Sequence, residues 1–159
     1  MANLLLIDSR EKPKATAKIL KDFDAIGVDH VTTKLLFGDY MDYCNPLLVV
    51  DRKQSLEELA RNCTIDHERF RRELELAKRV GARLVLLVEQ NRYRDRSEWI
   101  QVSSIGDLIK WDSGFSKIRG EKVYRVLTSW VKQYPLSVRF CTKSETGRQI
   151  LEILYGGEQ

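Results

Sequence analysis

Short apolar segments of strand length alternate with longer amphipathic segments, and this alternation is the strongest constraint on the fold. The strand-like segments cover residues 3–8, 28–37, 46–52, 83–90 and 136–141. The segments with apolar residues at helical spacing cover residues 12–27, 55–62, 67–80, 121–135 and 144–157. Such alternation predicts an α/β fold of three layers, in which a central mixed sheet carries helices on both faces.

The length of the chain fits a single domain. Its 159 residues suit one hydrophobic core, so we expect one domain in residues 1–155 and a short tail in residues 156–159. The least regular part is residues 91–119, where we expect an Arg-rich turn, a short helix in residues 103–111 and a loop in residues 114–120.

The composition favours an intracellular protein. The sequence has no apolar run of about 20 residues that would span a membrane, and its start does not resemble a signal peptide. Cys44, Cys63 and Cys141 form no CxxC pair, so neither a disulfide framework nor a zinc site is expected. We therefore expect the cytoplasm or nucleoid if the source is a prokaryote or phage, and the nucleus if it is a eukaryote.

The basic residues gather in residues 69–83, 91–96 and 117–125. The net charge of +4 and the pI near 9.0 favour a polyanionic partner. Each run alone fits a solvated helix face or loop, but three runs in one domain predict contacts with DNA phosphates. The candidate DNA-binding residues are Arg71, Arg72, Arg92, Arg94, Lys117, Arg119 and Lys122.

The strand in residues 46–52 leads directly into three charged residues, Asp51, Arg52 and Lys53. Residues two apart on a strand share a face, so Asp51 and Lys53 are expected on one side and Arg52 on the other. Asp39 lies in a Gly-Asp turn earlier in the sequence. The intervening length allows one short strand, a turn and a return beside Asp39.

Two carboxylates that meet at this point repel each other. At an effective dielectric of 20, like charges ~4 Å apart cost about 4 kcal/mol. A divalent cation removes this cost, and Mg²⁺ (or Mn²⁺) accepts one or two carboxylates together with waters and a phosphate. Lys53 would then orient the attacking water or offset charge on the phosphate, so the pattern predicts a phosphodiesterase site. The spacing alone equally allows exposed strand-end charges, with Asp39 as a turn former.

Several short blocks, taken in order, resemble the XPF-type nuclease domain, which is the excision-repair cross-complementation group four domain of XPF and Hef structure-specific endonucleases. The blocks are IDSRE (7–11), GD (38–39), VVDRKQSLE (49–57), DHERFRRELELAK (66–78), LVLLVE (84–89) and FCTKSETGRQILEIL (140–154). The resemblance covers nearly the whole chain. It implies the restriction-endonuclease-like nuclease fold of the PD-(D/E)xK superfamily.

The resemblance also implies the roles of the charged residues. The family pattern is Gly-Asp, a gap, Glu-Arg-Lys, three residues and Asp, and it implies that Asp39 and Asp51 are metal ligands. Lys53 would be the catalytic lysine, and Arg52 would form part of the active site. Asp51 stands where the family usually has Glu, and Glu57 where it usually has Asp.

Further residues are implied to lie near this site. Asp8 would be a third acid near the metal, although a strand-end residue that caps the next turn would look the same. Glu57 would support the site, or be only a first-turn residue favoured by the helix dipole. The remaining supporting residues implied are Arg10, Glu11 and Arg69.

The activity implied is that of a metal-dependent DNA endonuclease, which cleaves phosphodiester bonds at branched, flap or single-strand/duplex junction structures in DNA repair or recombination. The alternative is an inactive pseudo-nuclease that binds DNA or a partner protein. A nuclease for RNA or single strands is a third interpretation. The family's helix-hairpin-helix module has no counterpart in these residues. A homodimer is expected if the apolar stripe from Val123 to Val131 faces a second copy, and core packing explains that stripe equally well.

Overall fold

The computed structural model describes residues 3–90, 93–95, 98–113 and 117–156, and within residues 91–100 it describes only the backbone. The elements are β1 (Leu4–Asp8), α1 (Pro13–Ala25), β2 (Asp29–Thr33), β3 (Tyr40–Asp42), β4 (Asn45–Lys53), α2 (Leu56–Cys63), α3 (His67–Val80), β5 (Arg83–Glu89), β6 (Tyr93–Asp95), β7 (Glu98–Ile100), the 3₁₀ helix η1 (Ile105–Lys110), α4 (Gly120–Gln133), β8 (Leu136–Cys141) and α5 (Thr146–Tyr155). None of the helices in these ranges is long and apolar enough to cross a membrane.

Six strands form one mixed sheet, in the order β2-β1-β3-β4-β5-β8. On one side of the sheet β1 is parallel to β2, and on the other side β4, β5 and β8 are parallel to one another. The short strand β3 is antiparallel to both of its neighbours, β1 and β4. The hairpin of β3 and β4 thus brings the end of β4 back beside the start of β3, as the sequence predicted.

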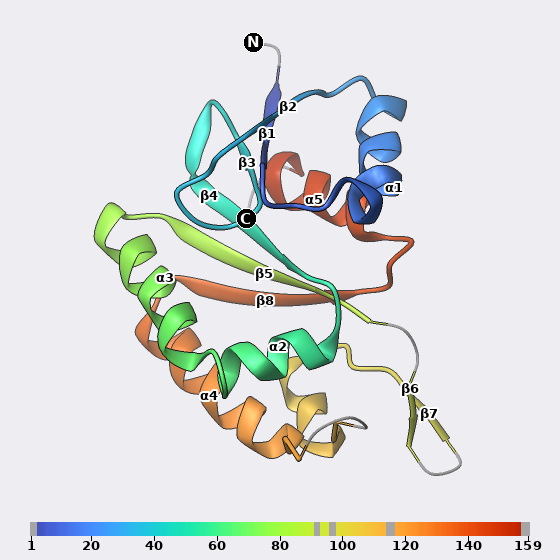
Figure 1. Cartoon of the computed structure of the whole chain (residues 1–159), viewed down its shortest axis with the longest axis vertical. Helices are drawn as coiled ribbons and strands as arrows, with labels where there is room; N and C mark the ends of the chain where they lie inside the picture. The colour runs from blue at the N-terminus through green and yellow to red at the C-terminus, as the bar shows by residue number, and fades with distance from the viewer. Residues whose placement is uncertain (1–2, 91–92, 96–97, 114–116, 157–159) are drawn as a thin grey trace.

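Helices cover both faces of this sheet, which confirms the predicted three-layer α/β fold (Figure 1). On β5, Leu84, Leu86 and Val88 pack in one core with α2, α3 and α4. Val85 and Leu87 point the other way, into the core formed with α1 and α5. Because β5 is buried on both faces, its sequence is a continuous apolar run rather than an alternating one.

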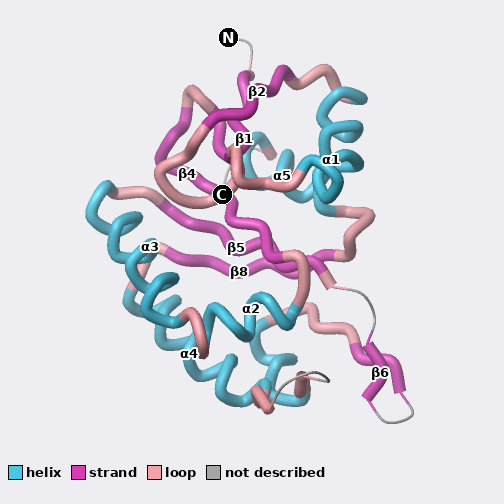
Figure 2. The backbone as a smooth tube through the Cα atoms, in the orientation of Figure 1, coloured by secondary structure: helices cyan, strands magenta, loops and turns pink. Residues whose placement is uncertain are grey.

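The irregular segment is only partly as expected. The predicted short helix is the 3₁₀ helix η1, and the expected Arg-rich turn contains an antiparallel ribbon of β6 and β7. This ribbon projects away from the main sheet (Figure 2). These two strands could not be predicted from periodicity, because each has only three residues.

The apolar stripe on α4 is mainly part of the core. Val123, Leu127 and Trp130 are buried among residues of α2, α3 and the sheet. Val131 is 37% exposed. Core packing therefore explains most of the stripe, and the homodimer stays a prediction.

Gly38 shapes the turn that carries Asp39. Its φ of 71° lies in the left-handed region that favours glycine. A Cβ on Gly38 would overlap Cγ1 of Val49 and lie 3.3 Å from the carbonyl oxygen of Val50. The close approach lets the Asp39 N–H donate to the Val50 carbonyl at 2.8 Å, while the Asp39 carbonyl accepts from the Asp8 N–H at 2.8 Å. Residue 39 is therefore pinned between β1 and β4.

The substitution Gly38→Ala should destabilise the fold much more than Gly27→Ala. Gly27 has a similar φ of 73° but an open site, with nothing within 4 Å of an added Cβ. Gly27→Ala should lower the free energy of unfolding by about 1 kcal/mol, because alanine is strained in the left-handed conformation. Gly38→Ala should lower the free energy of unfolding by about 3 kcal/mol, because overpacking against Val49 adds roughly 1–3 kcal/mol to the cost of the strained backbone. Urea denaturation measures both values, and equal losses would show that the close approach at Gly38 is unimportant.

Candidate active site

A polar cleft opens where the ends of β1 and β4 face α3. Its lining residues are Asp8, Arg10, Glu11, Lys12, Gly38, Asp39, Asp51, Arg52, Lys53, Gln54, Glu58, Asn62, Arg69 and Glu73. The fold thus brings together the residues that the sequence predicted as catalytic, metal-binding or supporting, except Glu57.

Asp39, Asp51 and Lys53 form the centre of the cleft. One Asp39 carboxylate oxygen accepts the backbone N–H of Arg52 at 2.7 Å. Lys53 Nζ lies 3.2 Å from Asp51 Oδ1 and 5.0 Å from the centroid of the Phe70 ring on α3. Asp51 is 5% exposed and Lys53 is 7% exposed. Their shared face on β4 is the one that the two-residue spacing predicted.

Burial and neighbouring charge shift the ionisation of this centre. Burial raises the pKa of the Asp39 carboxyl well above its usual value, and the negative charges of Asp51 and Glu11 raise it further. Burial lowers the pKa of Lys53, but the carboxylates of Asp51, Glu58 and Asp39 outweigh it and leave that pKa raised. Lys53 therefore keeps its ammonium charge at neutral pH. The positive charge near Asp39 does not offset its burial and its acidic neighbours.

The donor set at this centre fits a hard divalent cation. Asp39 and Asp51 supply carboxylate oxygens, and Mg²⁺ requires only one or two carboxylates besides waters and substrate phosphate. Within the described ranges, no three His, Cys, Asp or Glu side chains are grouped to hold a metal ion. Two carboxylates with water and phosphate oxygens are thus the coordination that these residues support.

Asp8 lies in the cleft, but its carboxylate already has partners. Its Oδ2 accepts from Arg10 Nε at 2.7 Å, and its Oδ1 accepts from the Leu35 N–H at 2.9 Å. Burial raises the pKa of Asp8, but the hydrogen bonds from Arg10 and Leu35 more than offset this, so the pKa is lowered. In this arrangement Asp8 orients Arg10 and the chain at Leu35, at the edge of the site.

Arg52 connects the cleft to the end of β5. Its Nε donates to Glu11 Oε2 at 2.8 Å, and its Nη1 donates to Glu89 Oε1 at 2.9 Å. The Tyr40 hydroxyl also donates to Glu11, at 2.7 Å, and the Thr146 hydroxyl donates to Glu89, at 3.0 Å. The side chain of Arg52 is 1% exposed. Through Glu11 and Glu89, it therefore ties the loop after β1 to β3, β4, β5 and α5.

The predicted support from Glu57 is not present in this structure. Its carboxylate accepts a hydrogen bond from Ser113, and it does not line the cleft. The neighbouring Glu58 lines the cleft instead and accepts from the Gln54 N–H at 2.7 Å. Consecutive residues on an α-helix point about 100° apart. Glu57, which the family pattern marks, therefore points away from the cleft when Glu58 points into it.

Glu73 is a cleft residue that the sequence analysis missed. It lies on α3, one helical turn after Arg69, and both residues line the cleft. Burial raises the pKa of Glu73, and the negative charge of Asp51 raises it further. The i, i+4 spacing from Arg69 could have identified Glu73, because residues at that spacing share a helix face.

The basic candidates whose side chains the structure describes lie outside the cleft. Arg71 forms ion pairs on α3, 3.1 Å from Glu68 and 3.7 Å from Glu75. Arg72 is exposed on the same helix. Arg92 and the side chain of Arg94 lie outside the described residues. Lys117, Arg119 and Lys122 line a second hollow, near the start of α4.

The mixed sheet, with Asp51 and Lys53 at the end of β4 and Asp39 in the turn before β3, defines an α/β domain with a polar cleft. A family model of the ERCC4 domain matches residues 7–153. The chain belongs to the ERCC4 domain family.

Solved structures support the same fold. The structure of XPF from Aeropyrum pernix matches with a TM-score of 0.64 and 14% sequence identity, covering 94% of this chain and 62% of that one. A structure of XPF from Aeropyrum pernix in complex with DNA matches with a TM-score of 0.61 and 14% identity, covering 95% of this chain and 62% of that one. The chain thus spans about 62% of the length of these relatives. No curated protein matches this sequence.

The substitution Arg52→Met should lower the free energy of unfolding by about 3–5 kcal/mol, since it leaves the buried carboxylates of Glu11 and Glu89 without their cation. Urea denaturation at neutral pH measures this loss. Arg71→Met is the control, because it removes a partly exposed arginine that pairs with acids on its own helix. A loss at Arg52 no larger than that at Arg71 would show that the buried network does not support the fold.

The substitution Asp39→Asn should raise the melting temperature in EDTA at neutral pH. Because the folded-state pKa of Asp39 is raised, its ionisation destabilises the folded protein above that pKa. The penalty disappears as the pH falls through the folded pKa towards the unfolded value. The gain in melting temperature should therefore shrink on acidification. For a chain of this size, 1 kcal/mol corresponds to roughly 2–4 °C.

The exposed Asp29 provides the control for this measurement by thermal melting. Asp29→Asn should leave the melting temperature nearly unchanged at each pH. Saturating Mg²⁺ should stabilise the wild type and bring its melting temperature closer to that of Asp39→Asn. A lower melting temperature of Asp39→Asn in EDTA at neutral pH would contradict the proposed repulsion.

Proposed function

We propose that this chain is a divalent-metal-dependent DNA endonuclease, which cleaves phosphodiester bonds at branched, flap or single-strand/duplex junction structures in intracellular DNA repair or recombination. The observation that carries the proposal is the cluster of Asp39, Asp51 and Lys53 in one cleft at the end of β4. Membership of the ERCC4 domain family supports it. The DNA complex of the similar XPF from Aeropyrum pernix supports DNA as the substrate.

Asp39 and Asp51 would hold Mg²⁺ or Mn²⁺ through their carboxylate oxygens. When bound, such an ion lowers the pKa of a water and polarises the phosphate. The Lys53 ammonium lies against Asp51, where it would offset the negative charge that develops on the phosphate. Arg10 and Arg69 line the same cleft, and they would bind the phosphates on either side of the scissile bond.

Burial prepares these groups for that role. Asp51 and Lys53 are nearly inaccessible to solvent, and the Arg52 network fixes the strand below them. Charges held in a dry, rigid site act more strongly than charges in water, and they need no reorganisation during the reaction. The side chain at position 51 is one methylene shorter than the usual Glu, and its carboxylate lies 3.2 Å from Lys53 Nζ.

The cleavage assay uses end-labelled duplex, flap, fork and four-way junction DNA, with Mg²⁺, Mn²⁺ or EDTA. The wild type should cut one or more junction substrates with metal and none in EDTA. Asp51→Asn and Lys53→Met should each lower the rate by about 100-fold or more, as is usual when a group that stabilises transition-state charge is removed. Asp51→Glu restores the family's usual residue and should keep activity.

Asp29→Asn, outside the cleft, is the matched control and should cut like the wild type. Cleavage that survives in EDTA, or that Asp51→Asn and Lys53→Met leave unchanged, would refute the proposal. Junction binding without cleavage by the wild type in either metal would identify the chain as a binding module instead.

A further inference from the structure

A second hollow lies beside the start of α4 and shares no lining residue with the cleft. We name it the α4 groove, and its lining is Thr64, Ile65, Lys117, Ile118, Arg119, Glu121, Lys122 and Arg125. The exposed surface inside it is mainly apolar, and Ile65 is 69% exposed. The groove therefore combines an apolar wall with a basic rim.

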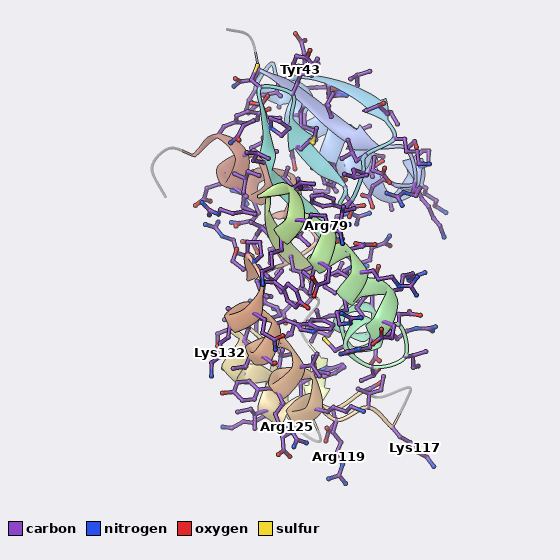
Figure 3. All side chains as sticks on the ribbon, turned by 90° about the vertical axis from the view of Figure 1, so that its left-hand side faces the viewer. Tyr43, Arg79, Lys117, Arg119, Arg125 and Lys132 are labelled. Carbon is purple, nitrogen blue, oxygen red and sulfur yellow. The ribbon has the colours of Figure 1, made fainter. Side chains whose placement is uncertain are left out.

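The rim carries a strong excess of positive charge. Lys117, Arg119, Lys122 and Arg125 face a single acid, Glu121. Within the described part of the chain, none of these four cations forms an ion pair. Figure 3 shows Lys117, Arg119 and Arg125 together at one end of the molecule. This arrangement is complementary to a chain of phosphates.

The basic surface continues along α4. Lys122 and Arg125 also line an adjoining hollow together with His67 and Trp130. The ring centroids of His67 and Trp130 lie 5.0 Å apart. Because Trp130 is buried, the apolar surface open to a ligand is that of Ile65 in the groove. Cations beside an exposed apolar surface suit unpaired nucleic acid, because single strands offer both phosphates and exposed base faces, whereas a duplex hides its base faces.

The α4 groove lies close to the cleft along the chain. Ile65 forms one wall of the groove, and Arg69, four residues later in the sequence, lines the cleft. Asp66, between them, lies 3.6 Å from Arg69 in an ion pair. The two hollows therefore lie on either side of the first turn of α3. Arg69, which is largely exposed, is thus one of the cleft residues that lie close to Ile65 in the sequence.

We propose that the α4 groove binds the single-stranded arm of a junction whose scissile phosphate lies in the cleft. The inference rests on the proposed function for its substrate class, since it assigns the unpaired arm to a surface of its own. Four cations opposed by one acid among the described lining residues, together with the nearness of Ile65 to Arg69 in the sequence, favour a nucleic acid strand over an acidic peptide.

The test measures fluorescence anisotropy of labelled oligo-dT and of a blunt duplex, in EDTA so that no cleavage occurs. The double variant Arg119→Gln/Arg125→Gln should weaken oligo-dT binding by about 10-fold or more at moderate salt, because two phosphate contacts are lost. The slope of log K against log salt concentration should become shallower by about 1.4, or roughly 0.7 for each contact with a single strand. Duplex binding should change less than twofold.

Arg79→Gln/Lys132→Gln is the matched control, because it removes the same charge from exposed residues outside the groove, which Figure 3 labels. It should leave oligo-dT binding within twofold of the wild type. Ile65→Ser, which keeps every cation, should also weaken oligo-dT binding several-fold if bases contact the apolar wall. Equal losses for the groove variant and the control would overturn the inference.

The outcomes separate this inference from the proposed function. If oligo-dT binding depends on the groove but the wild type never cleaves, the groove stands and the endonuclease proposal fails. If the wild type cleaves junctions but Arg119→Gln/Arg125→Gln binds oligo-dT like the wild type, the endonuclease proposal stands and the groove assignment fails. That second result would leave an acidic peptide as the partner that fits the groove.

Discussion

The structure of the site depends on how Arg52 is held within β4. Its backbone N–H donates to Asp39, and its buried side chain bridges Glu11 and Glu89. One residue thus fixes Asp39 through its backbone, and Glu11 and Glu89 through its side chain. A buried arginine needs such partners, since an unpaired charge away from water is strongly destabilising. The same requirement brings the loop after β1 and the start of α5 to the site.

The cleft contains more negative charge than its own cations neutralise. Its acids are Asp8, Glu11, Asp39, Asp51, Glu58 and Glu73. Asp8 pairs with Arg10, Glu11 with Arg52, and Asp51 with Lys53. Burial raises the pKa of Asp39 and Glu73, and the negative charge of Asp51 raises both further. Perturbed carboxyls in a cleft are typical of functional sites, and here the imbalance is located where a cation and a phosphate would meet.

The sequence predicted the layers of the fold and the centre of the site for identifiable reasons. Strand periodicity decided the shared face of Asp51 and Lys53, and the length of the hairpin decided the position of Asp39. Both follow from local geometry. Whether Glu73 lies in the cleft and Glu57 outside it depends on how α3 and α2 are rotated about their axes against the sheet. That rotation comes from packing of whole helices, so the order of family blocks could not reveal it.

The packing of α3 has a further consequence, through Phe70. This ring belongs to the hydrophobic core and also lies 5.0 Å from Lys53 Nζ, while Arg69 and Glu73 on the same helix line the cleft. A helix of this length is marginal by itself in water, so one wall of the cleft exists only while the core holds it. A nascent or partly opened chain therefore lacks a complete site. If the protein cuts DNA as proposed, only fully folded molecules would do so.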